Sequence, residues 1–250
     1  MTEQCIYALD FDGVICDSAI ETGITGWMTA SQLWGDMSEE LPPQPLLDSF
    51  RRVRPVLETG YEAILIMRLL FQGVDADTLL NNFSQKIQEI IQKDNLDTEH
   101  LKQLFGKTRD HWIEHNPKQW IAMNPLFPGI AEKLQTLNTQ GLWYITTTKQ
   151  ERFVKQILYA YHIELADERI YGLDRNMSKI AVLQQLLKAH PDQSICFIED
   201  RLPTLNNVMQ HEALTTIQLF LASWGYNTDQ DRSNVHNSPI TLINIEQFPG

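Results

Sequence analysis

The sequence predicts an α/β fold: a doubly wound, mostly parallel sheet whose chain is interrupted by an inserted all-helical domain. Two observations predict it. A single short apolar run stands at the start of the chain, and further short apolar runs alternate with amphipathic helical segments from about residue 121 onward. The intervening stretch of roughly a hundred residues has almost entirely helical periodicity. At 250 residues, the chain is long enough for one large domain or for a core with a smaller insert.

The predicted strands are short apolar runs bounded by residues that interrupt regular structure. The first is Ile6 to Leu9, and the later ones are Leu142 to Ile145, Ser194 to Ile198 and Thr215 to Leu221. Each run is too short to form a stable helix. Because helices separate these strands along the chain, we expect a parallel sheet that is covered by helices on both faces.

The segments between the later strands are predicted to be amphipathic helices, because their apolar residues recur every three or four positions. The three apolar stripes are Ile130, Leu134 and Leu137; Phe153, Ile157 and Leu158; and Ile180, Leu183, Leu186 and Leu187. The last helix is expected to end before Pro191, since proline cannot continue a helix.

Residues 18–122 are predicted to form the inserted helical domain, and residues 1–17 and 123–250 the α/β core. One apolar helical face of the insert consists of Leu79, Leu80, Phe83, Ile87, Ile90 and Ile91. The segment Pro42-Pro43-Gln44-Pro45 is expected to separate a helix that starts near Ser18 from one centred on residues 61–71. Segments rich in Asp, Ser, Pro and Gly mark the two junctions.

The charge balance excludes some classes of partner. The chain has 32 acidic and 20 basic residues, which gives a net charge of −12, and no basic run occurs. Binding to nucleic acid or to an anionic membrane needs clustered Lys and Arg, so neither is expected. We expect a monomer or weak dimer that acts on a small molecule.

The three cysteines, Cys5, Cys16 and Cys196, are too few and too scattered to indicate a disulfide framework or a zinc site. Cys5 and Cys196 lie in apolar, strand-like runs and are expected to be small buried hydrophobic residues. The polar N-terminus is unlike a signal peptide, and no run of 18 uncharged apolar residues occurs. These features predict a cytoplasmic protein.

The most informative stretch follows the first strand, where Asp10 and Asp12 are spaced at i and i+2 and are followed by Gly13. This spacing directs two strand side chains to the same face. Two carboxylates so close together repel, so the pKa of one rises unless a cation holds both. Mg²⁺, which prefers oxygen ligands, is the usual cation. The alternative interpretation is a solvated turn at the end of an ordinary buried strand.

Three later stretches carry polar groups where the pattern places a strand end or a helix start. Thr147 follows the second strand, or Thr146 if the register shifts by one; the alternative is a Thr-rich helix cap. Lys179 lies in the first turn of a helix, where it opposes the helix dipole unless an anion is near; the alternative is a surface lysine. Glu199 and Asp200 end an apolar strand, and adjacent buried acids are unfavourable unless paired or metal-bound.

Taken together, these four stretches resemble, in order, the four motifs of the haloacid dehalogenase (HAD) superfamily, whose members are mostly Mg²⁺-dependent phosphatases. Phe127-Pro128-Gly129 and Ser223-Trp224-Gly225-Tyr226 resemble its phosphoglycolate-phosphatase-like branch, which is related to the β-phosphoglucomutases. The resemblance covers the whole predicted core. It implies a Rossmann-like core and a helical C1 cap domain, which is inserted between the first and second motifs.

The resemblance also implies roles for individual residues. Asp10 would be the nucleophile and Asp12 the general acid and base, while Thr147 and Lys179 would hold the phosphoryl group. Thr148 replaces an asparagine that is common in the family and is expected to help bind the substrate. The implied Mg²⁺ ligands are Asp10, the backbone carbonyl of Asp12, Asp200 and Glu199, the last binding directly or through water. Many relatives carry a further acid at the position of Thr204, so the number of carboxylate ligands stays open.

The resemblance favours a phosphatase that hydrolyses a small phosphorylated metabolite through an aspartyl-phosphate. Asp12 argues against a dehalogenase, because dehalogenases of this fold lack the second aspartate. A β-phosphoglucomutase-like phosphotransferase and a non-catalytic binding or assembly protein remain alternatives. The cap would select the substrate, and Arg54 is a candidate substrate ligand. Arg54, Glu58 and Tyr61 have helical spacing, so an intrahelical ion pair of Arg54 with Glu58 is the competing interpretation.

Overall fold

A computed structural model describes residues 5–37 and 41–250 of the protein. The chain divides into two compact units. The α/β unit comprises Met1–Asp17 and Pro125–Gly250, and the helical unit comprises Ser18–Asn124. The second junction falls two residues after the one expected from the sequence. Each unit has its own buried apolar interior, as expected of a structure that could fold by itself.

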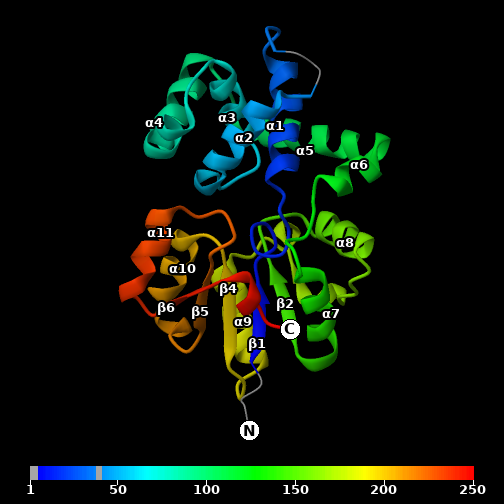
Figure 1. The fold of residues 1–250 in the computed structure, drawn as a ribbon, viewed down its shortest axis with the longest axis vertical. Helices are drawn as coiled ribbons and strands as arrows, with labels where there is room; N and C mark the ends of the chain where they lie inside the picture. Colours follow the sequence, from blue (N-terminus) through cyan, green and yellow to red (C-terminus); the bar gives the residue numbers. More distant parts are fainter. Residues whose placement is uncertain (1–4, 38–40) are drawn as a thin grey trace. The chain divides into compact units, whose positions relative to one another are not determined.

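The α/β unit is built on one six-stranded sheet in the order β3-β2-β1-β4-β5-β6 (Figure 1). Every neighbouring pair of strands is parallel, which confirms the predicted fold class. The strands are β1 (Ile6–Leu9), β2 (Trp143–Thr146), β3 (Ile170–Tyr171), β4 (Ile195–Glu199), β5 (Gln218–Ala222) and β6 (Ile240–Ile243). The four strands expected from the sequence are β1, β2, β4 and β5.

The strand order places a ligand-binding edge at the centre of the sheet. From β1 the chain leads to β2 and β3 on one side, and it then crosses to β4 on the other side of β1. In open α/β sheets, ligands bind beyond the carboxyl ends of the strands where the order reverses in this way. Leu9 pairs with Ile198, and the backbone N–H of Asp10 still donates to the Ile198 carbonyl at 2.9 Å. The residues that follow β1 and β4 are therefore held next to each other.

Helices cover the sheet of the α/β unit. They are α7 (Ile130–Gln140), α8 (Glu151–Ala160), α9 (Lys179–Ala189), α10 (Leu202–Met209) and α11 (Asp229–Asn234). On one face, Val182, Leu183 and Leu186 of α9 and Leu205 and Val208 of α10 form a core with Ile195 and Phe197 of β4. Of the α9 stripe predicted from the sequence, Leu183 and Leu186 are buried, and Ile180 and Leu187 are partly buried against the same core. The helix ends before Pro191 as expected.

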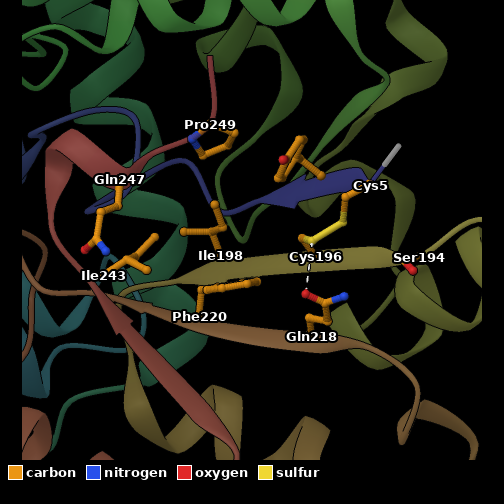
Figure 2. A pocket seen from close by; sticks show the side chains of 10 residues that line it. Cys5, Ser194, Cys196, Ile198, Gln218, Phe220, Ile243, Gln247 and Pro249 are labelled. Carbon is orange, nitrogen blue, oxygen red and sulfur yellow. Dashed lines mark hydrogen bonds between the residues drawn. A yellow bond between two sulfur atoms is a disulfide. The ribbon is translucent and has the colours of Figure 1, made fainter. Parts of the chain in front are cut away.

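The opposite face of β4 is lined differently, because successive strand residues point to opposite sides of a sheet. Cys196 and Ile198 border a cavity of about 300 Å³ together with Phe220 and the C-terminal residues Gln247 and Pro249 (Figure 2). Lys133 of α7 donates to the backbone carbonyls of Glu246 and Phe248, so the C-terminal segment is bound to this helix. None of the site residues predicted from the sequence lines this cavity.

The prediction that Cys5 and Cys196 are separate buried thiols is wrong. They form a disulfide with Cα atoms 6.2 Å apart, whereas Cys16 is a free buried cysteine (Figure 2). The strand register explains the pairing. Tyr7 of β1 lies opposite Cys196 of the neighbouring β4, and Cys5 is two residues before Tyr7, so the two cysteines are within disulfide reach. The 191-residue separation of the two cysteines concealed this proximity in the sequence.

Within residues 18–37 and 41–124, the helical unit contains six α-helices, as its periodicity predicted in outline. They are α1 (Ala19–Leu33), α2 (Gln44–Val53), α3 (Glu62–Phe71), α4 (Ala76–Lys93), α5 (Thr98–His115) and α6 (Pro117–Ala122). Trp27, Phe50, Ile64 and Leu79 belong to its buried core. Gly26 permits close packing of α1 on α3, since a Cβ there would lie 2.6 Å from the Ala63 carbonyl oxygen. No helix within residues 5–37 and 41–250 is long and apolar enough to cross a membrane.

Two details of the helical unit differ from the expectation. Helix α2 begins inside the Pro-rich segment, because a proline is tolerated in the first helical turn, where no N–H is needed. Arg54 lies in a short 3₁₀ helix, Arg54–Val56, and residues 57–61 are not helical. The helical spacing of Arg54, Glu58 and Tyr61 is therefore wrong. Arg54 is buried at 8% exposure, and its guanidinium donates to the Leu57 carbonyl.

Candidate active site

Three buried carboxylates meet at the carboxyl ends of β1 and β4. Asp10 follows β1, Glu199 ends β4 and Asp200 comes next, and their side chains offer oxygens within 4.8 Å of one another. Asp10 is 7% exposed, Glu199 is fully buried and Asp200 is 1% exposed. The parallel pairing of Leu9 with Ile198 brings these residues together, since Asp10 and Glu199 are the next pair along the two strands.

Lys179 provides a positive charge between two of these carboxylates. Its Nζ lies 3.0 Å from Asp10 Oδ1 and 2.6 Å from Glu199 Oε2. Lys179 is the first residue of α9, and the Ser178 side chain caps this helix by accepting from the Ala181 N–H. A cation at this end opposes the helix dipole. The two carboxylates supply the compensating charge that the sequence pattern requires.

The acidic cluster perturbs the pKa values of its members. Burial, followed by the nearby charge of Glu199, raises the pKa of Asp10 from 3.8 to about 7. Burial and the charges of Glu199 and Asp10 likewise raise the pKa of Asp200. Burial alone would raise the pKa of Glu199, but the charge and hydrogen bond of Lys179, together with hydrogen bonds from Asp200 and Arg201, outweigh it and lower that pKa. Ionising all three carboxylates is thus unfavourable without further positive charge.

Asp200 is held closely by two loops. Its Oδ2 accepts a hydrogen bond from the Tyr226 backbone N–H at 2.6 Å, and its carbonyl accepts from the Asn227 side chain. A Cβ on Gly13 would lie 1.9 Å from Asp200 Oδ2, and a Cβ on Gly225 would lie 2.3 Å from Asp200 Cβ. Gly13 also has φ +88°, a conformation that side chains rarely adopt. Both glycines are needed to admit the Asp200 carboxylate.

Asp12 lies two residues after Asp10 and contacts Lys149, which the sequence analysis did not single out. Lys149 Nζ is 2.8 Å from Asp12 Oδ1, and the Lys149 side chain is only 3% exposed. Lys149 ends the Thr-Thr-Thr-Lys run after β2. The signal available in the sequence was its place two residues after Thr147, where the family pattern often has a lysine.

The candidate phosphate-binding threonine lies just past β2. Thr146 ends the strand and is 1% exposed, whereas Thr147 is the first residue beyond it. The Thr147 backbone N–H donates to the Tyr171 carbonyl, and its hydroxyl oxygen accepts from the Lys149 N–H at 3.1 Å. That oxygen is thereby oriented, and its hydroxyl proton is available to a further acceptor. Thr148 is exposed.

The predicted site residues therefore divide into three groups. Asp10, Lys179, Glu199 and Asp200 form one connected cluster. Asp12 and Thr147 lie at the carboxyl ends of β1 and β2, which are neighbouring strands, and both contact Lys149. Thr148 is exposed beside Thr147, and Arg54 belongs to the helical unit, so their assignments as substrate ligands stay predictions.

The donor set fits a hard divalent cation. Three carboxylates with converging oxygens are the ligands that Mg²⁺ prefers. Counting Asp12 and the two lysines, the six ionised side chains carry four negative and two positive charges, so the net charge is −2. A divalent cation would balance that excess. Burial raises the pKa values of Asp10 and Asp200 most, and the charges of the neighbouring carboxylates raise them further.

The fold is that of HAD-like phosphatases, and solved structures share it over nearly the whole chain. A predicted phosphatase from Clostridium acetobutylicum superposes with a TM-score of 0.58 at 16% identity, covering 97% of this chain and 95% of that one. A HAD-like hydrolase from Streptococcus pneumoniae gives 0.54 at 21% identity, with 97% and 95% coverage. A predicted phosphoglycolate phosphatase from Haemophilus somnus gives 0.57 at 15% identity, with 93% and 92% coverage.

The likeness is one of structure more than of sequence. No family model matches the chain, and no curated protein matches it in sequence. At these identities the comparisons establish the HAD-like fold, which confirms the fold to which the sequence resemblance pointed.

Proposed function

We propose that this protein is a Mg²⁺-dependent phosphatase that hydrolyses a small phosphorylated metabolite through an aspartyl-phosphate intermediate. The observation that carries the proposal is the buried Asp10, Glu199 and Asp200 cluster around Lys179, at the edge where this fold binds ligands. A buried excess of negative charge lowers stability, so its retention favours a functional role. The phosphatase descriptions of the structural neighbours agree with this proposal.

In the first chemical step, a carboxylate oxygen of Asp10 attacks phosphorus as the bond to the leaving oxygen breaks. Asp12 gives its proton to that leaving oxygen, which departs as an alcohol. In the second step, Asp12 takes a proton from water as the water oxygen attacks phosphorus. The bond between phosphorus and Asp10 then breaks, which releases inorganic phosphate and restores the Asp10 carboxylate.

The remaining residues stabilise charge. Lys179 and the Thr147 hydroxyl would donate to the phosphoryl oxygens on which negative charge develops. Mg²⁺ would be held by Asp10, the backbone carbonyl of Asp12, Asp200 and Glu199. When bound, the ion would neutralise phosphoryl charge and the mutual repulsion of the carboxylates. Glu199 already pairs with Lys179, so its contribution to the metal is expected to be weaker than that of Asp200.

The helical unit is proposed to act as the cap that selects the substrate. Its position in the chain supports this, since Ser18–Asn124 is inserted between Asp12 and the second motif at Thr147. We expect a small-molecule substrate, as the composition suggests. The sequence also predicted a cytoplasmic enzyme, but the Cys5–Cys196 disulfide removes the argument from unpaired cysteines, because disulfides are rare in reducing compartments. Thr148 and Arg54 are proposed to contact the substrate.

The test is phosphate release from a panel of phosphometabolites and p-nitrophenyl phosphate, with and without Mg²⁺. Wild-type protein should turn over at least one compound only when Mg²⁺ is present. Asp10→Asn should reduce turnover by about 10⁴-fold or more, because the nucleophile is lost. The exposed Asp77→Asn in the helical unit serves as a matched control and should keep full activity. Mg²⁺-independent turnover, or an active Asp10→Asn variant, would contradict the proposal.

A further inference from the structure

The backbone N–H and the backbone carbonyl of Lys149, just past β2, both form hydrogen bonds. Its N–H donates to the Thr147 hydroxyl oxygen at 3.1 Å, and its carbonyl accepts from the Leu173 N–H at 3.0 Å. The residue is 6% exposed. The backbone of Lys149 is therefore held in place, and its buried side chain can adopt few orientations.

The Lys149 side chain ends at Asp12. Nζ lies 2.8 Å from Asp12 Oδ1 and 6.0 Å from the centre of the Phe11 ring. The loop that carries Asp12 is itself tight, since Ile15 N and Cys16 N both donate to the Phe11 carbonyl and Gly13 N donates to the Cys16 carbonyl. The contact thus joins two constrained loops from neighbouring strands.

A buried ion pair is often no more stable than apolar side chains of similar volume in place of both partners. A purely structural reason for Lys149 is therefore weak. Its partner is the carboxyl group that the proposed mechanism uses for proton transfer. A carboxyl group has two oxygens, so an ammonium bonded to one of them fixes the plane of the group while a proton is exchanged at the other.

We propose that Lys149 is a positioning residue that orients the Asp12 carboxyl group toward the leaving oxygen. This inference rests on the proposed phosphatase function. Proton donation requires the donor to lie within hydrogen-bonding reach of the leaving oxygen, and misplacement by about 1 Å can reduce a rate 100-fold. The role differs from that of Lys179, which contacts Asp10 and Glu199.

The role has a signature that depends on the leaving group. Phenolate needs a proton as it leaves, whereas p-nitrophenolate is stable without one, and the two aryl phosphates have similar shapes. Loss of Asp12 orientation should therefore reduce kcat/KM for phenyl phosphate much more than for p-nitrophenyl phosphate. If Lys149 instead bound the phosphate group, its loss would reduce kcat/KM equally for the two compounds and would weaken inhibition by inorganic phosphate.

The experiment measures kcat/KM for both compounds in wild type, Lys149→Met and Lys149→Arg. Lys149→Met should lose roughly 10- to 100-fold on phenyl phosphate and less than about 3-fold on p-nitrophenyl phosphate, with unchanged phosphate inhibition. Lys149→Arg, which keeps the charge and guards against misfolding of the first variant, should recover part of the loss. Lys155→Met, a half-exposed lysine paired with Asp167, is the matched control and should change neither value.

Two further readouts complete the design. In an Asp12→Ala background, Lys149→Met should cause no additional loss, because a positioning residue acts through the group it positions. A crystal structure of Lys149→Met should show the Asp12 side chain in a different or mixed rotamer. Equal losses on both substrates, additive losses with Asp12→Ala, or an unmoved Asp12 would each overturn the inference while leaving the phosphatase function intact. A wild-type protein without turnover would instead overturn the proposed function, and this inference with it.

Discussion

Each unit of the molecule buries a carboxylate among charged partners, and the two arrangements differ in their balance. In the helical unit, Glu21 is fully buried and receives both Nε and a terminal nitrogen of Arg109 at 2.8 Å. Thr25 and Trp120 also donate to Glu21, at 2.8 and 3.0 Å. One acid is thus matched by one base, and neutral donors fill the remaining positions.

The cluster in the α/β unit has no such balance. Asp10, Glu199 and Asp200 lie together, and Lys179 contacts Asp10 and Glu199. The pKa of Asp10 rises to about 7 through burial and the charge of Glu199. Buried charge therefore has two uses in this protein, one structural and one chemical. The Glu21 network joins α1, α5 and α6 of its own unit, whereas the acidic cluster is left short of positive charge that a metal ion and a reaction can use.

Breaking the balanced network should have the largest effect on stability. Arg109→Met leaves the Glu21 carboxylate buried without its guanidinium, which should destabilise the helical unit by about 3–5 kcal/mol in denaturant unfolding. Arg52→Met, which removes an exposed ion pair with Asp77 in the same unit, should change stability by less than about 1 kcal/mol. Adding Glu21→Gln to Arg109→Met should recover part of the loss. Similar values for the two single variants would show that the Glu21 network is not a structural anchor.

Crowding the acidic cluster should have the next largest effect. Gly13→Ala introduces a Cβ that would lie 1.9 Å from Asp200 Oδ2 and forces alanine to adopt φ +88°. We expect about 2–3 kcal/mol of destabilisation and a Mg²⁺ affinity reduced at least about 10-fold, measured by calorimetry. Gly129→Ala, at φ +80° with open space around it, is the matched control in the same unit. It should lose only about 1 kcal/mol and keep its Mg²⁺ affinity. Equal Mg²⁺ affinities in the two variants would contradict this account of Gly13.

The unbalanced charge should also appear in the pH dependence of stability. The pKa of Asp10 in the folded protein, about 7, lies above its ordinary value of 3.8, so ionisation of Asp10 opposes folding. The stabilising contribution of the protonated form is complete below pH 3.8 and is lost as the pH rises through 7. Metal-free protein should therefore lose on the order of 1–3 kcal/mol between pH 5 and 8 from this group.

Mg²⁺ should reverse that loss, because it stabilises the ionised carboxylates. The increase in Tm on adding Mg²⁺ should be larger at pH 8 than at pH 5, and Asp200→Asn should abolish most of it. A Tm that responds to Mg²⁺ equally at both pH values, or equally in Asp200→Asn, would show that the ion binds elsewhere.

Local patterns in the sequence were sufficient for much of the fold. β1 spans the expected residues, Ile6–Leu9, and α9 starts at Lys179 after the Ser178 cap, because apolar runs and caps are local signals. β3 and β6 were not predicted, since a two-residue strand and the Ile240–Ile243 run acquire their identity from neighbouring strands. Helix α2 was not predicted for the same reason. The proline in its first turn is typical of a segment that interrupts a helix, and the packing of Phe50 in the core shows that a helix forms there.

The site shows a similar division. Asp10, Asp12, Lys179 and the Glu199-Asp200 pair could be identified as candidates because each lies at or just after the end of a strand, or begins a helix. The contacts between these side chains could not be predicted from the sequence. The contact between Lys149 and Asp12 spans 137 residues, and the disulfide between Cys5 and Cys196 spans 191. Both depend on the neighbouring positions of β1, β2 and β4, which the strand order alone reveals.

We propose that the acidic cluster lowers the stability of the metal-free protein and is required for phosphate release. The Asp10→Asn variant tests both statements most directly. Phosphate release and thermal unfolding should be measured on the same metal-free and Mg²⁺-loaded samples at pH 8. We expect Asp10→Asn to abolish turnover and, without metal, to unfold at a higher temperature than wild type. A variant that is less stable than wild type without metal, or that still releases phosphate, would contradict this expectation.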